Sequence, residues 1–184
     1  KELALYDDHA GIIEIDQPVE PGASFADVFE LNDYLLDIEN KSLTHRPDAF
    51  GVIGFAREVA GIQGKAFRTP EWLSHSAPVE TVEQSSDAAP RVVIEDPILS
   101  DRFTGMVFEG ASEAAQSPLW MQTYLARSGM RPINAIVDIT NYLMLLTGQP
   151  MHAYDYDKLL EVSGGVNEVR VRAARPGENL KILD

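Results

Sequence analysis

The chain has 184 residues, of which 45% are hydrophobic, and this suits one large domain or an average domain with a smaller unit. It contains no cysteine, which excludes disulfides, thiolate metal sites and a cysteine nucleophile. No window approaches the roughly 18 uninterrupted apolar residues of a membrane helix. The opening KELALYDD also lacks the basic-then-apolar layout of a secretory signal. We therefore expect a cytosolic protein without a membrane span.

The formal net charge of −14 is concentrated in the first half, because residues 1–90 contain six basic and seventeen acidic residues. An acidic chain gains no general counterion-release attraction for nucleic acid. Any contact with RNA must therefore be local or depend on another polypeptide. For most of the first half, we interpret the acidic surface as a solvated face that favours solubility.

The first third of the chain is expected to form a small strand-helix unit. The apolar runs AGIIEI, residues 10–15, and YLLDIEN, residues 34–40, predict strands. A helix is predicted over 48–61, because Pro47 suits a first helical turn, apolar residues recur at helical spacing, and Gly61 can end the helix.

The stretch that follows, residues 67–90, has three prolines, four serines and no sustained period. This composition predicts a linker or a long surface connection. RVVIED, residues 91–96, and RFTGMVFEG, residues 102–110, then predict strands joined by a turn around Pro97.

A second helix is predicted over 117–129, with Ser117 as its N-cap and Gly129 past its end. Trp120 and Tyr124 lie four residues apart, so they share a helix face.

The stretch RPINAIVDITNYLMLLTGQPMHAYDYDKL, residues 131–159, predicts a helix that Asn134 begins and Gly148 closes, followed by a turn. Its polar residues are more numerous than a simple core helix needs: Arg131, Asp138, Thr140, Asn141, Gln149 and His152. After it, alternation over 169–173 predicts a half-exposed strand, then a Pro-Gly turn and the start of another strand.

Several polar and aromatic residues have a structural interpretation beside a functional one. We interpret Asp138 as a buried structural acid, and His45 with Arg46 as having a structural cap or interface role rather than forming a phosphate site. Trp72 and Trp120 are interpreted as packing residues rather than base-stacking platforms.

The same choice arises at the two ends of the 131–159 stretch. Arg131, before Pro132, fits an ordinary ion-pair partner, and His152 fits a satisfied, partly buried histidine. His152, Asp155 and Asp157 carry metal-ligating groups, but they fall in a turn with mixed directions and without cysteine. We therefore predict no metal site.

The 131–159 stretch resembles a signature of the beta chain of phenylalanine–tRNA ligase, in its central module. The match extends backwards through SPLWMQTYLARSGM and RFTGMVFEG to LDIENKSLTHRPDAFGVIGFAREVAGI, and forwards to VRVRAARPGENLKILD. It covers nearly the whole chain, with residues 67–90 the least distinctive. A long ordered set of polar and apolar positions is far more specific than a lone glycine motif.

The resemblance implies that the chain is a piece of that beta chain with an α+β fold. Residues 91–184 would be the N-terminal portion of the central tRNA-editing-type module, a layered sheet/sheet/helix arrangement truncated at Asp184. Residues 1–66 would be part of the beta-chain N-terminal domain, with residues 67–90 as the linker between them.

The resemblance also implies a site. In bacterial members the central module hydrolyses tyrosine wrongly attached to the phenylalanine tRNA, and matching motif positions implies catalytic roles for Thr140, Asn141 and His152 and substrate binding by Arg131. Ester hydrolysis needs a positioned water, groups that stabilise the oxyanion, and a pocket for the amino acid. The group that recognises the tyrosine hydroxyl would lie beyond Asp184.

The partners implied by the resemblance are the alpha subunit and the aminoacylated 3′ end of the phenylalanine tRNA, in the cytoplasm. ATP and magnesium would serve the parent enzyme at its alpha-chain site. We therefore expect no cofactor bound by this fragment, and no aminoacylation by the isolated chain.

Two other functions compete with editing. The first is a structural docking module of the alpha/beta assembly that has no hydrolytic activity. The second is a free-standing RNA-binding module, which the net charge of −14 disfavours.

Overall fold

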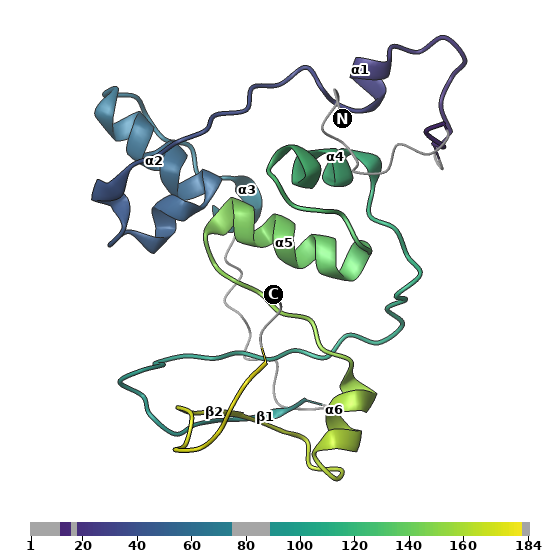
Figure 1. Cartoon of the computed structure of the whole chain (residues 1–184). Helices are drawn as coiled ribbons and strands as arrows, with labels where there is room; N and C mark the ends of the chain where they lie inside the picture. Colours follow the sequence, from purple (N-terminus) through teal and green to yellow (C-terminus); the bar gives the residue numbers. More distant parts are fainter. Residues whose placement is uncertain (1–11, 16–17, 75–88, 182–184) are drawn as a thin grey trace. The chain divides into compact units, whose positions relative to one another are not determined.

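The computed structural model describes residues 12–15, 18–74 and 89–181, which mix helices with a small sheet (Figure 1). In chain order the elements are α1 (Phe25–Val28), the 3₁₀ helices η1 (Lys41–Leu43) and η2 (Pro47–Phe50), α2 (Val52–Ile62), α3 (Glu71–Ser74), β1 (Arg91–Ile94), α4 (Leu119–Arg127), α5 (Ala135–Thr147), α6 (Tyr156–Val162) and β2 (Glu168–Val171). The expected mixture of helix and strand is confirmed, whereas the layered sheet/sheet/helix arrangement is not. In these ranges no helix has the length and apolar character needed to cross a membrane.

The described residues fall into two compact units, and the chain passes between them more than once. One unit is formed by residues of 1–74 and 111–153, and the other by residues of 75–110 and 154–184. The first therefore holds α1 to α5 without β1, and the second holds β1, α6 and β2. The assignment of 1–66, 67–90 and 91–184 to domains of a longer protein stays a prediction.

Helix α4 supplies most of the core of the first unit. Leu119 packs against Phe29, which is only 1% exposed and stacks on Phe25 with 4.2 Å between ring centroids. At the last residue of the helix, the Arg127 side chain reaches the same segment, because its guanidinium donates to the Leu31 carbonyl at 3.2 Å. The buried apolar residues of the described chain are Phe29, Leu119, Met121 and Leu125.

A second face of α4 contacts α5 through aromatic rings. Trp120 and Tyr124 both meet Tyr142 of α5 edge to face, each with 5.2 Å between ring centroids. This confirms that the two α4 aromatics share a face and that Trp120 packs. Trp72 is 54% exposed, so the packing interpretation of that residue is wrong.

Two glycines let η2 and α2 approach other backbone without side chains between. A β-carbon on Gly51 would lie 2.3 Å from the amide nitrogen of Gly148, at the end of α5. One on Gly54 would lie 1.9 Å from the carbonyl oxygen of Asp48. Because real β-carbons do not come so near other atoms, both positions need glycine in this packing.

Arg46 fastens the same segment. Its guanidinium donates to both carboxylate oxygens of Asp48 at 2.8 Å and to Glu58 at 3.1 Å. These bonds raise the pKa of Arg46, and the bond from Arg46 lowers the pKa of the Asp48 carboxyl. The structural role predicted for Arg46 is confirmed.

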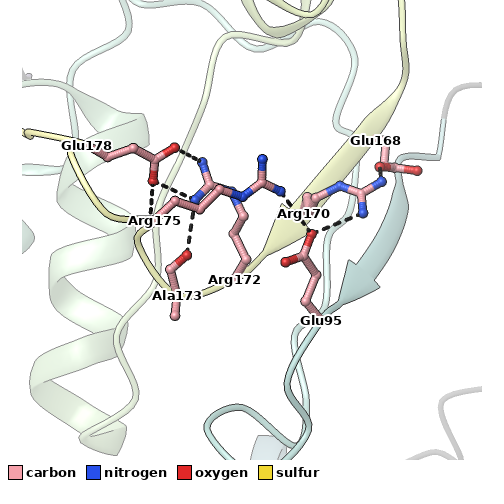
Figure 2. A network of polar contacts seen from close by, with 7 residues as sticks. All are labelled: Glu95, Glu168, Arg170, Arg172, Ala173, Arg175 and Glu178. Atoms are coloured by element: carbon pink, nitrogen blue, oxygen red, sulfur yellow. Dashed lines mark hydrogen bonds and ion pairs between the residues drawn. The ribbon is translucent and has the colours of Figure 1, made fainter.

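In the second unit, β1 and β2 form a parallel pair in which Arg91 lies opposite Glu168 and Ile94 opposite Val171. Figure 2 shows that Arg170 of β2 bridges the pair: it donates to Glu95, just after β1, at 3.2 Å, and also to Glu168. The β1 and β2 strand predictions are confirmed.

The turn after β2 is held by one carboxylate. Both terminal nitrogens of Arg172 donate to Glu178 at 2.7 Å, and the backbone N–H of Arg175 donates to it at 2.7 Å (Figure 2). These bonds, with that from the Arg172 side chain the strongest, lower the pKa of Glu178 to about 2.

Four of the predicted strands are absent from the described residues. Residues 34–40 and 102–110 have no strand, and neither have 12–15, the described part of the first prediction. Residues 179–181 likewise show no strand, with 182–184 outside the described residues. A strand needs a ladder partner, and β-forming side chains alone do not supply one.

Two helix boundaries also differ from the predictions. Ser117 does not cap α4, whose N-cap is Pro118, because the Ser117 hydroxyl bonds Asp138 instead. Gly61 does not end α2, which continues to Ile62; Gly64 takes the left-handed conformation beyond it, with φ 62°. The turn at Pro97 is confirmed, since the Asp96 carboxylate accepts from the Ile98 N–H at 2.9 Å.

Candidate functional site

The helix α5 carries the central residues of the predicted site, and its ends are fixed by local bonds. Asn134 begins it by accepting the Val137 N–H at 3.0 Å, as predicted. Gly148 ends it in the left-handed conformation, with φ 76°, and donates its N–H to the Met144 carbonyl at 2.8 Å. Both caps were predicted from sequence because each depends on a single residue type at a single position.

Thr140 and Asn141 are adjacent and partly buried on α5. The Thr140 hydroxyl donates to the Val137 carbonyl at 2.7 Å, one turn back along the helix. Its proton is therefore engaged within the helix, and the oxygen offers only lone pairs to a ligand. In this arrangement Thr140 can accept a hydrogen bond from water, but it cannot at the same time donate to an oxyanion.

Arg131 and His152 lie outside the two ends of α5, and both are exposed. The thirteen residues of α5 separate those ends by roughly 20 Å, with Thr140 near the middle. Five residues lead from Thr147 to His152, and a chain of that length reaches at most about 17 Å. The reach is enough for His152 to return to the middle of the helix.

The chain leaves α5 through a well-defined turn. The Thr147 hydroxyl donates to the Leu143 carbonyl at 2.7 Å and accepts the Gln149 N–H at 3.1 Å. A β-carbon on Gly148 would lie 2.5 Å from the carbonyl oxygen of Pro47, so η2 is packed against this turn. The N-terminal part of the first unit therefore supports the segment that leads to His152.

At the other end of α5, the segment after Arg131 is held by Asp138. This carboxylate is fully buried and accepts the Ile133 N–H at 2.8 Å and the Ser117 hydroxyl. The structural role predicted for Asp138 is confirmed. Its bond to Ser117 was not predicted, because the two residues are twenty-one positions apart.

One aromatic residue near the site also escaped prediction. Tyr142, next to Asn141, receives the edges of both Trp120 and Tyr124. Burial raises the pKa of Tyr124, with further contributions from Tyr142 and Asp33. The signal was the aromatic spacing on α4, which indicated a packed face without indicating its partner.

The described residues hold no group of three or more His, Asp or Glu side chains arranged to bind a metal ion. Asp155, one member of the cluster considered from sequence, accepts the Lys158 N–H at 3.0 Å as the N-cap of α6. A hollow of about 380 Å³ lies elsewhere in the first unit and includes none of the predicted site residues; it is lined by Ala26, Asp27, Glu30, Asn32 and Asp33.

Comparison with known proteins gives a consistent result. Residues 99–184 match the family described as the B3/4 domain. The whole chain is 38% identical to the phenylalanine–tRNA ligase beta subunits of Bordetella pertussis and Yersinia pestis, and 37% identical to that of Pectobacterium atrosepticum. Each match covers all 184 residues of this chain and 21% of the relative.

The resemblance described from the sequence is therefore confirmed. The chain spans about a fifth of the length of these relatives, 21% in each case. The B3/4 match begins at residue 99 and includes α4, α5, α6 and β2. All four predicted site residues fall within it.

Proposed function

We propose that this chain is a segment of the beta subunit of a phenylalanine–tRNA ligase and contributes to a site that hydrolyses mischarged tyrosyl-tRNA. The observation that carries the proposal is similarity to such beta subunits along the entire chain, at 37–38% identity. The editing role is the finer part of the proposal. It is supported by Thr140 and Asn141, two adjacent polar residues that are partly buried on α5.

Under this proposal, α5 presents the water and the ester. Thr140, whose proton is engaged by the Val137 carbonyl, accepts a hydrogen bond from the attacking water. The side-chain amide of Asn141 donates to the developing oxyanion. His152 moves a proton at near-neutral pH, and Arg131 binds a phosphate or the carbonyl region through its planar guanidinium.

Hydrolysis at a second site makes energetic sense for these two amino acids. Tyrosine differs from phenylalanine by one hydroxyl group. A site built to hydrogen-bond that hydroxyl rejects the analogue that lacks it, because the buried polar partner would be left unpaired. Under the proposal, this polar partner lies in the part of the beta subunit beyond Asp184.

The proposal extends to the larger assembly. The partners are the alpha subunit and the aminoacylated end of the phenylalanine tRNA, in the cytoplasm, where translation takes place. ATP and magnesium act at the alpha-chain site, and no residue of this chain is assigned to them. In the complete module, the β1–β2 pair and the helices are parts of a layered sheet/sheet/helix arrangement.

A docking module without hydrolytic activity is the second candidate function. It is favoured by the exposed positions of Arg131 and His152, since neither side chain is held in an enclosed site. It is disfavoured by the adjacent, partly buried polar side chains of Thr140 and Asn141 on α5.

A deacylation assay separates the two candidates. The full beta subunit, assembled with its alpha partner, should clear tyrosyl-tRNA, and His152→Ala should slow clearance by roughly 100-fold, the loss expected for a general acid or base. Asn141→Ala should also slow the clearance of tyrosyl-tRNA, because it removes the proposed donor to the oxyanion. Phenylalanine attachment should be unchanged in both variants, because its site lies on the other subunit.

His45→Ala is the control, because this histidine is exposed and lies outside the proposed site. Normal clearance in both the His152 and Asn141 variants would remove these residues from the site. An unmodified enzyme that leaves tyrosyl-tRNA intact would favour the docking function.

A further inference from the structure

The buried carboxylate of Asp138 connects the three segments that surround the α5 N-terminus. One oxygen accepts the Ile133 N–H at 2.8 Å, from the segment that starts at Arg131. The other accepts the hydroxyl of Ser117, which precedes α4. Asp138 itself belongs to the first turn of α5, where the helix dipole favours a negative charge. One side chain thus joins the Arg131 segment to the helix of Thr140 and Asn141.

Ser117 is itself held from two sides. It is 3% exposed, and its carbonyl accepts the side-chain amide of Gln122 at 2.7 Å. Close by, the Ala135 N–H donates to the Ala115 carbonyl at 2.8 Å, which ties the first residue of α5 to the same segment. The backbone that carries the hydroxyl is therefore fixed. Its hydrogen bond to Asp138 fixes the orientation of the carboxylate relative to that backbone.

The carboxylate has no ion-pair partner among the described residues, and it is 0% exposed. A buried carboxylate held only by hydrogen bonds is costly to retain for stability, since an apolar side chain would fill the space without that cost. What an apolar side chain could not supply is the geometry that the directional bonds of Asp138 impose on the Ile133 N–H and the Ser117 hydroxyl.

We propose that Asp138, oriented by Ser117, is a positioning residue that sets Arg131 relative to Thr140 and Asn141. The inference rests on the proposed function, because it assigns the position of substrate-binding and catalytic groups in that same site. Asp138 touches no substrate. It acts through the two-residue link from Ile133 to Arg131 and through the helical turn from Asp138 to Asn141.

The test is a double-mutant cycle in the full beta subunit assembled with its alpha partner. Ser117→Ala removes the donor to Asp138, and Arg131→Ala removes the side chain that is positioned. If Ser117 acts through Arg131, Ser117→Ala slows tyrosyl-tRNA deacylation by roughly 10-fold or more. In the Arg131→Ala background, the same change then adds less than about 2-fold, since interacting residues are not additive.

Thr123→Val is the matched control for the loss of a buried hydroxyl. Thr123 lies on α4, is 4% exposed, and its hydroxyl has no hydrogen-bond partner among the described residues. Its replacement should leave deacylation unchanged. Ser117→Cys is the second variant should Ser117→Ala not fold, because it keeps a side chain of similar size and replaces the hydroxyl with a much weaker hydrogen-bond donor.

The outcomes are distinct. Deacylation by the unmodified enzyme, with Ser117→Ala and Ser117→Cys no slower than Thr123→Val, would overturn positioning and leave the proposed function standing. Fully additive effects of Ser117→Ala and Arg131→Ala would also overturn it. Additivity would show that the loss caused by Ser117→Ala does not act through Arg131. No deacylation by the unmodified enzyme would overturn both proposals.

Discussion

Glu178 shows how a single exposed carboxylate can organise a turn. It receives two bonds from Arg172 and one from the Arg175 backbone, and its pKa falls from 4.5 to about 2. Because the folded pKa lies below the ordinary value, the stabilisation of the turn is complete above pH 4.5 and is lost as the pH falls towards 2. The side chain is exposed, so this effect belongs to the turn rather than to the whole fold.

We predict that NMR titration of the Glu178 carboxyl will show protonation near pH 2, and that in Arg172→Gln its pKa will rise towards 4.5. Lys181→Gln, which removes a charge outside this set of bonds, is the control. A Glu178 carboxyl that titrates at its ordinary pKa in the unmodified chain would show that the bonds in Figure 2 do not persist in solution.

Prediction from the sequence was most successful for residues that act on their own backbone. Asn134 and Gly148 were identified as the ends of α5, and Asp138 as a buried structural acid. Ser117 was assigned to the wrong partner, because a serine before a proline has the pattern of a cap whether or not its hydroxyl is used elsewhere. The geometry of Thr140 could not be predicted, because its choice between solvent and the Val137 carbonyl depends on packing around α5.

At the scale of elements, the contacts of α2 are decided by glycines rather than by its apolar stripe. Gly54 is the buried residue of α2, and Val52 is 51% exposed. The helix was predicted from its apolar spacing, but its closest approach is backbone to backbone. Hydrophobic periodicity does not detect such a contact, because a glycine contributes no side chain to the pattern.

Gly54→Ala should therefore lower the free energy of unfolding by at least about 2 kcal/mol, because the new β-carbon would lie 1.9 Å from the carbonyl oxygen of Asp48. Gly61→Ala is the matched control on the same helix, where a β-carbon meets nothing within 4 Å. It should raise the free energy of unfolding by roughly 0.4–1 kcal/mol.

Urea denaturation of the unmodified chain and both variants measures these changes. Equal effects of the two substitutions would mean that α2 does not pack on η2 as described. A stabilising effect of Gly54→Ala would have the same meaning, because helix propensity alone favours alanine.

At the scale of the whole molecule, the described surface carries many large apolar side chains. Tyr34 is 91% exposed, Leu36 74%, Ile98 93% and Phe108 76%. A surface with this many exposed large apolar side chains favours association with a partner or another copy. The net charge of −14 acts in the opposite sense, because like charges on two copies repel one another.

We predict that the isolated chain self-associates, and more strongly at high salt, where repulsion between copies is screened. Sedimentation velocity at several concentrations and at low and high salt measures this, and Leu36→Lys should weaken it. A monomer at every concentration and salt would contradict the prediction.

The sequence alone determined the local features of this protein. Helix caps, helical periodicity and the β1 and β2 patterns each depend on residues within one or two turns of each other, and the resemblance depends on the order of residues along the chain. These features can be predicted from the sequence because the interactions that produce them are short in range.

Only the tertiary structure decided which elements pack together. It placed α4 and α5 in the unit of α2, paired β1 with β2, left residues 34–40 without a strand and brought Ser117 to Asp138. The physical reason is that such contacts join residues far apart in sequence. Their free energy depends on shape and on competing partners, which no local pattern of residue types records.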